Sequence, residues 1–159
     1  LSPTQLDRFM FRIILDYPTL EEEVEILRNK TKSSDPSGQI ISKDQILQAR
    51  KFLIDNMSID DSISDYISTI VQSTRTKEGI IIGASPTAAV SLLNASRGHA
   101  AIIRGSDKVT TEDVKAVAFD VLNHRLLIKQ SDIADSGTDA ESSNSAEKII
   151  SDIIQSGGN

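Results

Sequence analysis

The chain has 159 residues, of which 38% are hydrophobic and only 4% aromatic, and it carries a net charge of −6 at pH 7. This length suffices for one domain with tails, and Leu, Ile, Val and Ala must form the core because Trp is absent. The acidic balance disfavours nucleic-acid binding, which needs a basic face, and the absence of Cys excludes disulfides, thiol catalysis and Cys-based zinc sites.

Residues 1–18 predict a turn followed by one β-strand. Residues 9–15 (FMFRIIL) are apolar and rich in β-forming residues, and Pro18 marks the exit because proline cannot continue a ladder. No second convincing strand follows, so we expect 9–15 to be an orphan strand. The chain opens at Leu1 in mid-pattern, without Met, and we interpret it as a fragment of a longer protein. No apolar run approaches the roughly 20 residues of a membrane span.

Capping sequences mark the first two expected helices. Thr19 with Glu22 predicts a capping box for a helix at 19–30, with an apolar stripe through Leu20, Val24 and Leu27. Residues 31–41 predict a loop, after which Ser42 caps a second helix. The buried face of that helix is predicted to consist of Ile46, Ala49, Phe52 and Leu53.

Three more helices are expected before residue 128. The third spans 59–77, and Ile80 to Ile82 should be extended. Ser85 as N-cap and Pro86 at the first helical position predict the fourth, whose small residues suit close packing. Thr110, with Asp113 facing back, predicts the start of the fifth.

The C-terminal part predicts a flexible acidic linker at 129–145 and a short amphipathic helix at 146–159. The inward positions of that helix are Ile149, Ile150, Ile153 and Ile154. The expected fold class is therefore mainly α: a small helical bundle preceded by one short orphan β-strand.

Residue chemistry alone supplies few candidate site residues. We interpret Ser85 as a helix cap rather than a nucleophile, and His99 and His124 as structural, because their spacing does not suit a metal. Two features stand out. Arg8 is either a surface charge or an arginine presented to a phosphate, and the helix start at 83–86 is either a capped terminus or an anion site.

Six segments, in unbroken order over residues 1–128, resemble MoxR-type AAA+ ATPases. Residues 1–9 (LSPTQLDRF) resemble the family's L-P-E-A-Q-L-D-R-F, and Tyr17-Pro18 with Glu21 to Glu23 resembles Y-P-s-x-x-E-E. Thr74-Arg75 followed by residues 83–86 (GASP) resembles T-R…G-A-S-P-R-A. Residues 107–114 (DKVTTEDV) and 124–126 (HRL) resemble D-Y-V-T-P-D-D-V…H-R-L.

The resemblance implies that residues 1–18 end an AAA+ core and that 19–128 form its α-helical lid. It implies that the full-length protein binds and hydrolyses ATP with Mg²⁺, whereas this fragment has no catalytic activity and binds no cofactor. It also implies that the full-length protein forms a cytoplasmic ring, typically a hexamer. This ring would act as a chaperone in the maturation of partner complexes. A von Willebrand factor A-domain protein is one implied partner.

The implied site residues begin with Arg8, which matches the family's arginine finger and would act on ATP in a neighbouring subunit. Tyr17 and Pro18 lie at the core–lid hinge and would line an adenine pocket. The lid's phosphate-sensing arginine is expected at position 87, where this chain has Thr87. Either lid sensing is lost, or a base such as Arg75 or Arg97 substitutes for it.

Two other functions remain open. One is a non-enzymatic α-helical protein-interaction module, for which strand 9–15 would find a partner inside the chain. The other is a helix-turn-helix DNA binder, which the charge disfavours because no helix face concentrates Lys and Arg. Tight binding in a low-salt gel shift would support the DNA binder.

Overall fold

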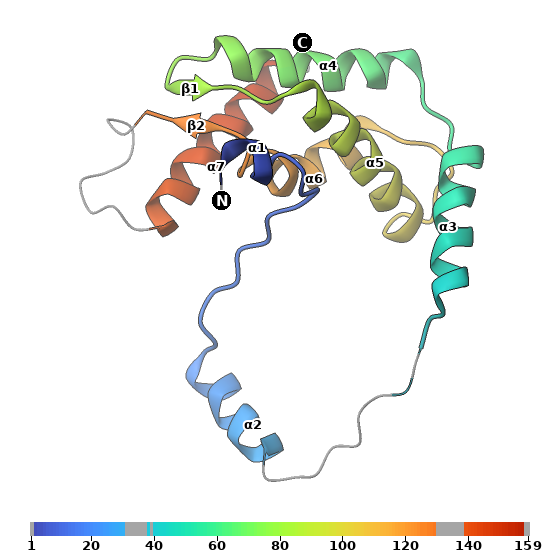
Figure 1. Cartoon of the computed structure of the whole chain (residues 1–159), viewed down its shortest axis with the longest axis vertical. Helices are drawn as coiled ribbons and strands as arrows, with labels where there is room; N and C mark the ends of the chain where they lie inside the picture. Colours follow the sequence, from blue (N-terminus) through green and yellow to red (C-terminus); the bar gives the residue numbers. More distant parts are fainter. Residues whose placement is uncertain (1, 31–37, 39, 130–138, 158–159) are drawn as a thin grey trace. The chain divides into compact units, whose positions relative to one another are not determined.

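The structure is a computed structural model that describes residues 2–30, 38, 40–129 and 139–157 (Figure 1). It is mainly α-helical, as predicted. The chain divides into two compact units, Leu1–Arg12 with Phe52–Asn159 and Ile13–Lys51, and each is described here by itself.

The larger unit is a helical bundle with a small sheet. Its elements are α1 (Pro3–Leu6), α4 (Asp61–Thr76), β1 (Ile80–Ile82), α5 (Pro86–Ile102), α6 (Thr111–Leu122), β2 (Leu127–Ile128) and α7 (Asp139–Ser156). The side chains of Ile70, Leu92 and Leu122 are fully buried where α4, α5 and α6 meet. The buried alanines of α5, Ala88, Ala95 and Ala100, confirm its predicted packing face.

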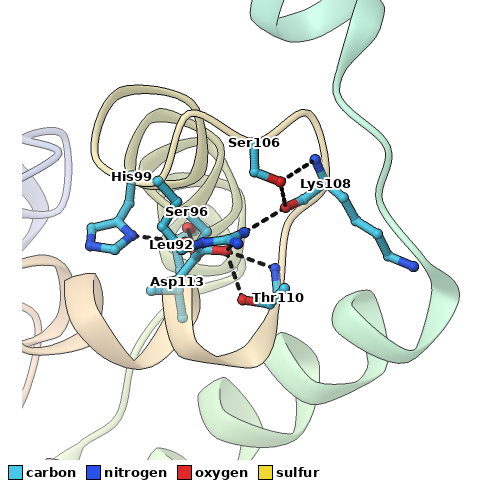
Figure 2. Close-up of polar contacts among 8 residues, drawn as sticks. Leu92, Ser96, His99, Ser106, Lys108, Thr110 and Asp113 are labelled. Carbon is cyan, nitrogen blue, oxygen red and sulfur yellow. Dashed lines mark hydrogen bonds and ion pairs between the residues drawn. The ribbon is translucent and has the colours of Figure 1, made fainter.

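The buried carboxylate of Asp113 joins the end of α5 to the start of α6 (Figure 2). Each of its oxygens accepts a hydrogen bond of 2.7 Å from the Arg104 guanidinium, and His99 Nδ1 lies 2.8 Å from Oδ1. Oδ2 also accepts from the backbone N–H and the hydroxyl of Thr110, both at 2.8 Å. The predicted capping pair is confirmed, and the buried charge has the hydrogen-bond donors it requires.

The structure contains a two-stranded sheet where the sequence predicted only an orphan strand. β1 pairs with β2 in an antiparallel arrangement, with Ile80 opposite Ile128 and Ile82 opposite Leu127. Residues 9–15, predicted as a strand, belong to no strand in the described part of the chain, although the Arg12 N–H donates to the Asp120 carbonyl at 2.9 Å. Apolar β-forming residues are insufficient for a strand when no extended partner lies beside them.

The smaller unit contains α2 (Leu20–Lys30) and the first part of α3 (Lys43–Asn56). The predicted caps are confirmed: the Thr19 N–H donates to Glu22 at 2.7 Å, and the Ser42 N–H donates to Gln45 at 2.8 Å. The buried face predicted for the second helix is wrong, because α3 contains no buried residue and the side chain of Phe52 is 60% exposed. Of the four predicted positions, Leu53, in the part of α3 that belongs to the larger unit, is partly buried against the core.

Helix α7 belongs to the bundle rather than to a separate tail. Ile150 and Ile153 are buried in the core, and the Tyr66 hydroxyl donates to the Ile154 carbonyl at 3.3 Å. The predicted linker at 129–145 is partly wrong, because residues 139–145 already form the first part of α7. Residues 130–138 of that linker lie outside the described residues.

Candidate functional site

The start of α5 is anchored by the end of α4. Thr74 Oγ1 accepts the Ala84 N–H at 2.9 Å, and Arg75 Nε donates to the Ala84 carbonyl at 3.0 Å. Gly83 passes so close that a Cβ would lie 2.7 Å from Arg75 Cα and 2.7 Å from the Thr74 carbonyl oxygen. Only glycine fits here, and the position of α5 relative to α4 is therefore set tightly.

Ser85 is the N-cap residue of α5, as predicted, but its side chain does not cap the helix. Instead its hydroxyl donates to the carboxylate of Asp7, at 2.8 Å from Oδ2 and 3.0 Å from Oδ1. A carboxylate is favourable at this end of α5 because the helix dipole is positive there. Of the two alternatives for the helix start at 83–86, a capped terminus or an anion site, the structure shows a terminus whose N-cap residue binds a carboxylate of the chain itself.

Arg125 holds the same N-terminal segment from a second side. Its side chain is 1% exposed, and Nη2 donates to the carbonyls of Asp7, at 3.2 Å, and Phe9. Nε lies 3.5 Å from Asp7 Oδ1. His124 Nε2 lies 3.0 Å from the Phe9 carbonyl and must carry a proton to donate to it. The main chain on both sides of Arg8 is therefore held by the turn that follows α6.

Burial governs the ionisation of the two residues in that turn. Burial lowers the pKa of His124, and the nearby positive charges of Arg125 and Arg12 lower this pKa further. The hydrogen bond to the Phe9 carbonyl acts in the opposite direction but does not outweigh them. Burial also lowers the pKa of Arg125, while the charge of Asp7 acts in the opposite direction. His124 is accordingly neutral at pH 7, and Arg125 remains the cation of the turn because an arginine side chain stays protonated far above neutral pH.

The predicted arginine finger, Arg8, lies just after α1 and is exposed. Its backbone N–H donates to the Gln5 carbonyl at 3.3 Å. Within the described part of the chain, no hydrogen bond or ion pair engages its guanidinium. The side chain is free to reach outward from a backbone that is held on both sides.

The structure brings three of the predicted site residues to one region of the larger unit. Thr87 is exposed in the first turn of α5, and Arg75 is exposed at the end of α4. Arg8 is next to Asp7, which bonds Ser85 two positions before Thr87. All three therefore adjoin the start of α5.

Tyr17 and Pro18 belong to the smaller unit and are exposed, Tyr17 almost completely. They border an open groove whose other lining residues are Asp16, Glu22, Glu25, Ile26 and Asn29. A flat, exposed aromatic ring beside an apolar side chain offers a stacking surface.

Sequence reasoning gave no site role to Asp7 or Arg125, and it interpreted His124 as structural without a partner. The resemblance of residues 124–126 to the family's H-R-L ending was the available signal, but no contact partner could be inferred from it. Among the described residues, no group of three or more His, Asp or Glu side chains is arranged to hold a metal ion. No helix in the described ranges is long and apolar enough to cross a membrane.

Comparison with known proteins identifies the bundle. Residues 72–152 match the family model of the AAA lid domain. The chain is 33% identical over 144 residues to the chaperone MoxR1 of Mycobacterium tuberculosis, covering 85% of this chain and 38% of that protein. It is 32% identical over 130 residues to the uncharacterized protein YeaC of Bacillus subtilis, covering 80% of this chain and 40% of that protein.

A solved structure has the same fold over almost the whole chain. It is the crystal structure of a candidate ATPase from Cytophaga hutchinsonii, with a TM-score of 0.80 and 30% sequence identity. The alignment covers 98% of this chain and 48% of that one. The chain thus spans about two fifths of the length of the curated relatives it matches.

Proposed function

Because the chain belongs to the AAA lid domain family and corresponds to the C-terminal part of a MoxR-type AAA+ ATPase, we propose that it is the lid of a ring-forming ATPase. In the full-length protein, ATP would bind with Mg²⁺ and be hydrolysed, and the lid would respond to the state of the nucleotide. For the isolated chain we propose neither hydrolysis nor tight nucleotide binding.

The observation that carries this proposal is the presentation of Arg8. Its guanidinium is exposed and unengaged within the described residues, while the carbonyls on either side are held by Arg125. A planar guanidinium has five N–H donors, which suits the oxygens of a transferring phosphoryl group. Arg8 would stabilise the charge that develops on the γ-phosphate bound by a neighbouring subunit.

For lid sensing, we propose that Arg75 replaces the arginine missing at position 87. Arg75 Nε bonds the Ala84 carbonyl, three residues before Thr87, and no described residue forms a hydrogen bond with either Nη group. Arg97 is a poor substitute, because ten residues of helix separate it from Thr87 by about 15 Å. Its Nη1 also donates to Asn94 at 3.1 Å.

Other parts of the proposal follow the family resemblance. Tyr17 and Pro18 would contact the adenine, with the exposed Tyr17 ring as a stacking face. We propose no Mg²⁺ ligand among the described residues. The ring, in the hexameric form, would act in the cytoplasm as a chaperone for maturing protein complexes, with a von Willebrand factor A-domain protein as partner.

The test is steady-state ATP hydrolysis by the assembled full-length protein, wild type against Arg8→Ala. We expect kcat to fall by about 10³-fold or more with ATP affinity unchanged, since an arginine finger acts in the transition state. Arg12→Ala is the matched control, an exposed arginine of the same segment whose observed bonds are made by its main chain. Equal turnover of Arg8→Ala and wild-type rings would refute the role of Arg8.

A further inference from the structure

Two separate parts of the lid hold the residues on either side of Arg8. Ser85, at the start of α5, binds the Asp7 carboxylate through hydrogen bonds of 2.8 and 3.0 Å. Arg125, after α6, binds the carbonyls of Asp7 and Phe9. Residues 7 and 9 are thereby tied to the bundle, and residue 8 between them carries the exposed guanidinium.

The bonds of Arg125 start from a buried side chain, whereas the Asp7 side chain that Ser85 binds is 26% exposed. The Arg125 side chain is 1% exposed, and its Nη2 also donates to the Ser91 hydroxyl of α5 at 3.1 Å. Breaking such contacts would leave a buried charge without partners, which is strongly unfavourable. The N-terminal segment is therefore expected to follow the start of α5 when α5 moves.

We propose that Asp7, Ser85 and Arg125 form a positioning clamp for Arg8, through which the start of α5 sets the position of the finger. This inference rests on the proposed role of Arg8. The same end of α5 carries Thr87, and Arg75 bonds it through Ala84. A displacement of this end of α5 would thus reach Arg8 directly through the bonds of Ser85 to Asp7, and indirectly through Arg125, which bonds both Ser91 of α5 and the main chain beside Arg8.

The mildest way to open the clamp is Ser85→Ala in the full-length protein, because it removes a single hydroxyl and leaves Arg125 in place. Without this bond, the segment around Arg8 remains tied to α5 through Arg125 and Ser91, but Asp7 loses its direct bond to the start of the helix. Misplacement of a catalytic group by about 1 Å lowers turnover by about 10²-fold. We expect kcat to fall by roughly 10- to 100-fold, with KM and the ATP dissociation constant unchanged. Ser85→Thr, which keeps a hydroxyl, should restore most of the turnover.

Ser96→Ala is the matched control. Ser96 also lies in α5, but its hydroxyl donates to the Leu92 carbonyl of the same helix at 2.8 Å rather than to residues 7–9. We expect its turnover to equal that of the wild type. A fall in turnover common to Ser85→Ala and Ser96→Ala would overturn the clamp, since loss of any α5 hydroxyl would then suffice.

A double variant separates positioning from general damage. If Ser85 acts through Arg8, then Arg8→Ala with Ser85→Ala should have the kcat of Arg8→Ala alone. A further fall of the same size as in the single variant would overturn the clamp, as would wild-type turnover of Ser85→Ala while Arg8→Ala is inactive. Unchanged turnover of Arg8→Ala is a distinct result, because it removes the proposed function and the clamp together.

Discussion

Arg104 binds Asp113 through two parallel hydrogen bonds of 2.7 Å, one to each carboxylate oxygen. Asp113 is completely buried, whereas the Arg104 side chain is 35% exposed. The same guanidinium donates to the Lys108 carbonyl at 2.7 Å. The pair therefore fixes both ends of the connection between α5 and α6, whose packing forms the centre of the lid.

Removing this carboxylate should destabilise the bundle. In Asp113→Ala, the Arg104 guanidinium, the Thr110 N–H and His99 all lose their acceptor, and α6 loses its capping partner. Because Arg104 is partly hydrated, we expect unfolding free energy to fall by about 2–4 kcal/mol, below the full effect of breaking a buried pair. Urea unfolding measures this quantity.

Glu112→Ala is the control for that measurement. Glu112 lies in the same helical turn but is exposed and pairs only with Lys115, at 2.8 Å, among the described residues. A surface pair contributes about 0–1 kcal/mol. If both variants lost the same unfolding free energy, Asp113 would act only as a negative charge near the N-terminus of α6.

Stability should also depend on pH through Asp113. Burial by itself raises the pKa of this carboxyl, but the hydrogen bonds from Arg104, His99 and Thr110 outweigh it, and the net pKa lies well below the usual range. A carboxyl with a lowered pKa in the folded state contributes stability above its unfolded pKa of about 3.9. That contribution is lost as pH falls from there through the folded pKa.

The comparison with Asp113→Asn isolates this effect, because the amide does not titrate. Urea midpoints should converge for the two proteins as pH drops below about 4, since only the wild type loses the contribution of an ionised Asp113. Parallel pH profiles for the wild type and Asp113→Asn would contradict the assignment.

Two glycines should respond to alanine in opposite directions. In Gly83→Ala the new Cβ would meet main-chain atoms at 2.7 Å, and we expect the free energy of unfolding to fall by about 1–3 kcal/mol. In Gly98→Ala, within α5, the Cβ meets nothing within 4 Å. Alanine has the better helix propensity, so the free energy of unfolding should rise by about 0.5–1 kcal/mol. Thermal unfolding measures both changes, and a neutral Gly83→Ala would contradict the close approach of α4 to residues 83–84.

The proposed substitution of Arg75 for a sensor arginine can be tested by moving the charge. In the full-length protein, Arg75→Ala should weaken ATP binding several-fold, because a cation near the start of α5 is removed. Adding Thr87→Arg to that variant should restore binding, since it returns a guanidinium to the exposed first turn. Fluorescent nucleotide titration measures both. Unaltered affinity in Arg75→Ala would mean that this lid does not sense nucleotide through Arg75.

The parts of the structure that were predictable depend on residues three positions apart. The pairs Thr19 with Glu22, Ser42 with Gln45 and Thr110 with Asp113 all formed, because one helical turn brings position i+3 back to the cap whatever the rest of the chain does. Pro86 likewise marked the first turn of α5.

Burial was harder to predict because it depends on what covers a surface. The apolar stripe of α2 has the spacing of a helix face that packs in a core, yet the side chain of Leu27 is 68% exposed. Residues 9–15 have the composition of a strand, but the short ladder formed instead between residues 80–82 and 127–128. Periodicity shows that a face is apolar but carries no information about its partner.

The candidate site shows the same division. The sequence alone shows which residue types the site contains, such as Arg8, Gly83 and Thr87. Their order along the chain was sufficient to suggest the family. The contact that relates them, Ser85 to Asp7, joins residues 78 positions apart. Such a pairing arises only when α4, α5 and α6 pack and bring the turn at 124–125 and the start of α5 to the same N-terminal segment, because no local preference acts over that separation.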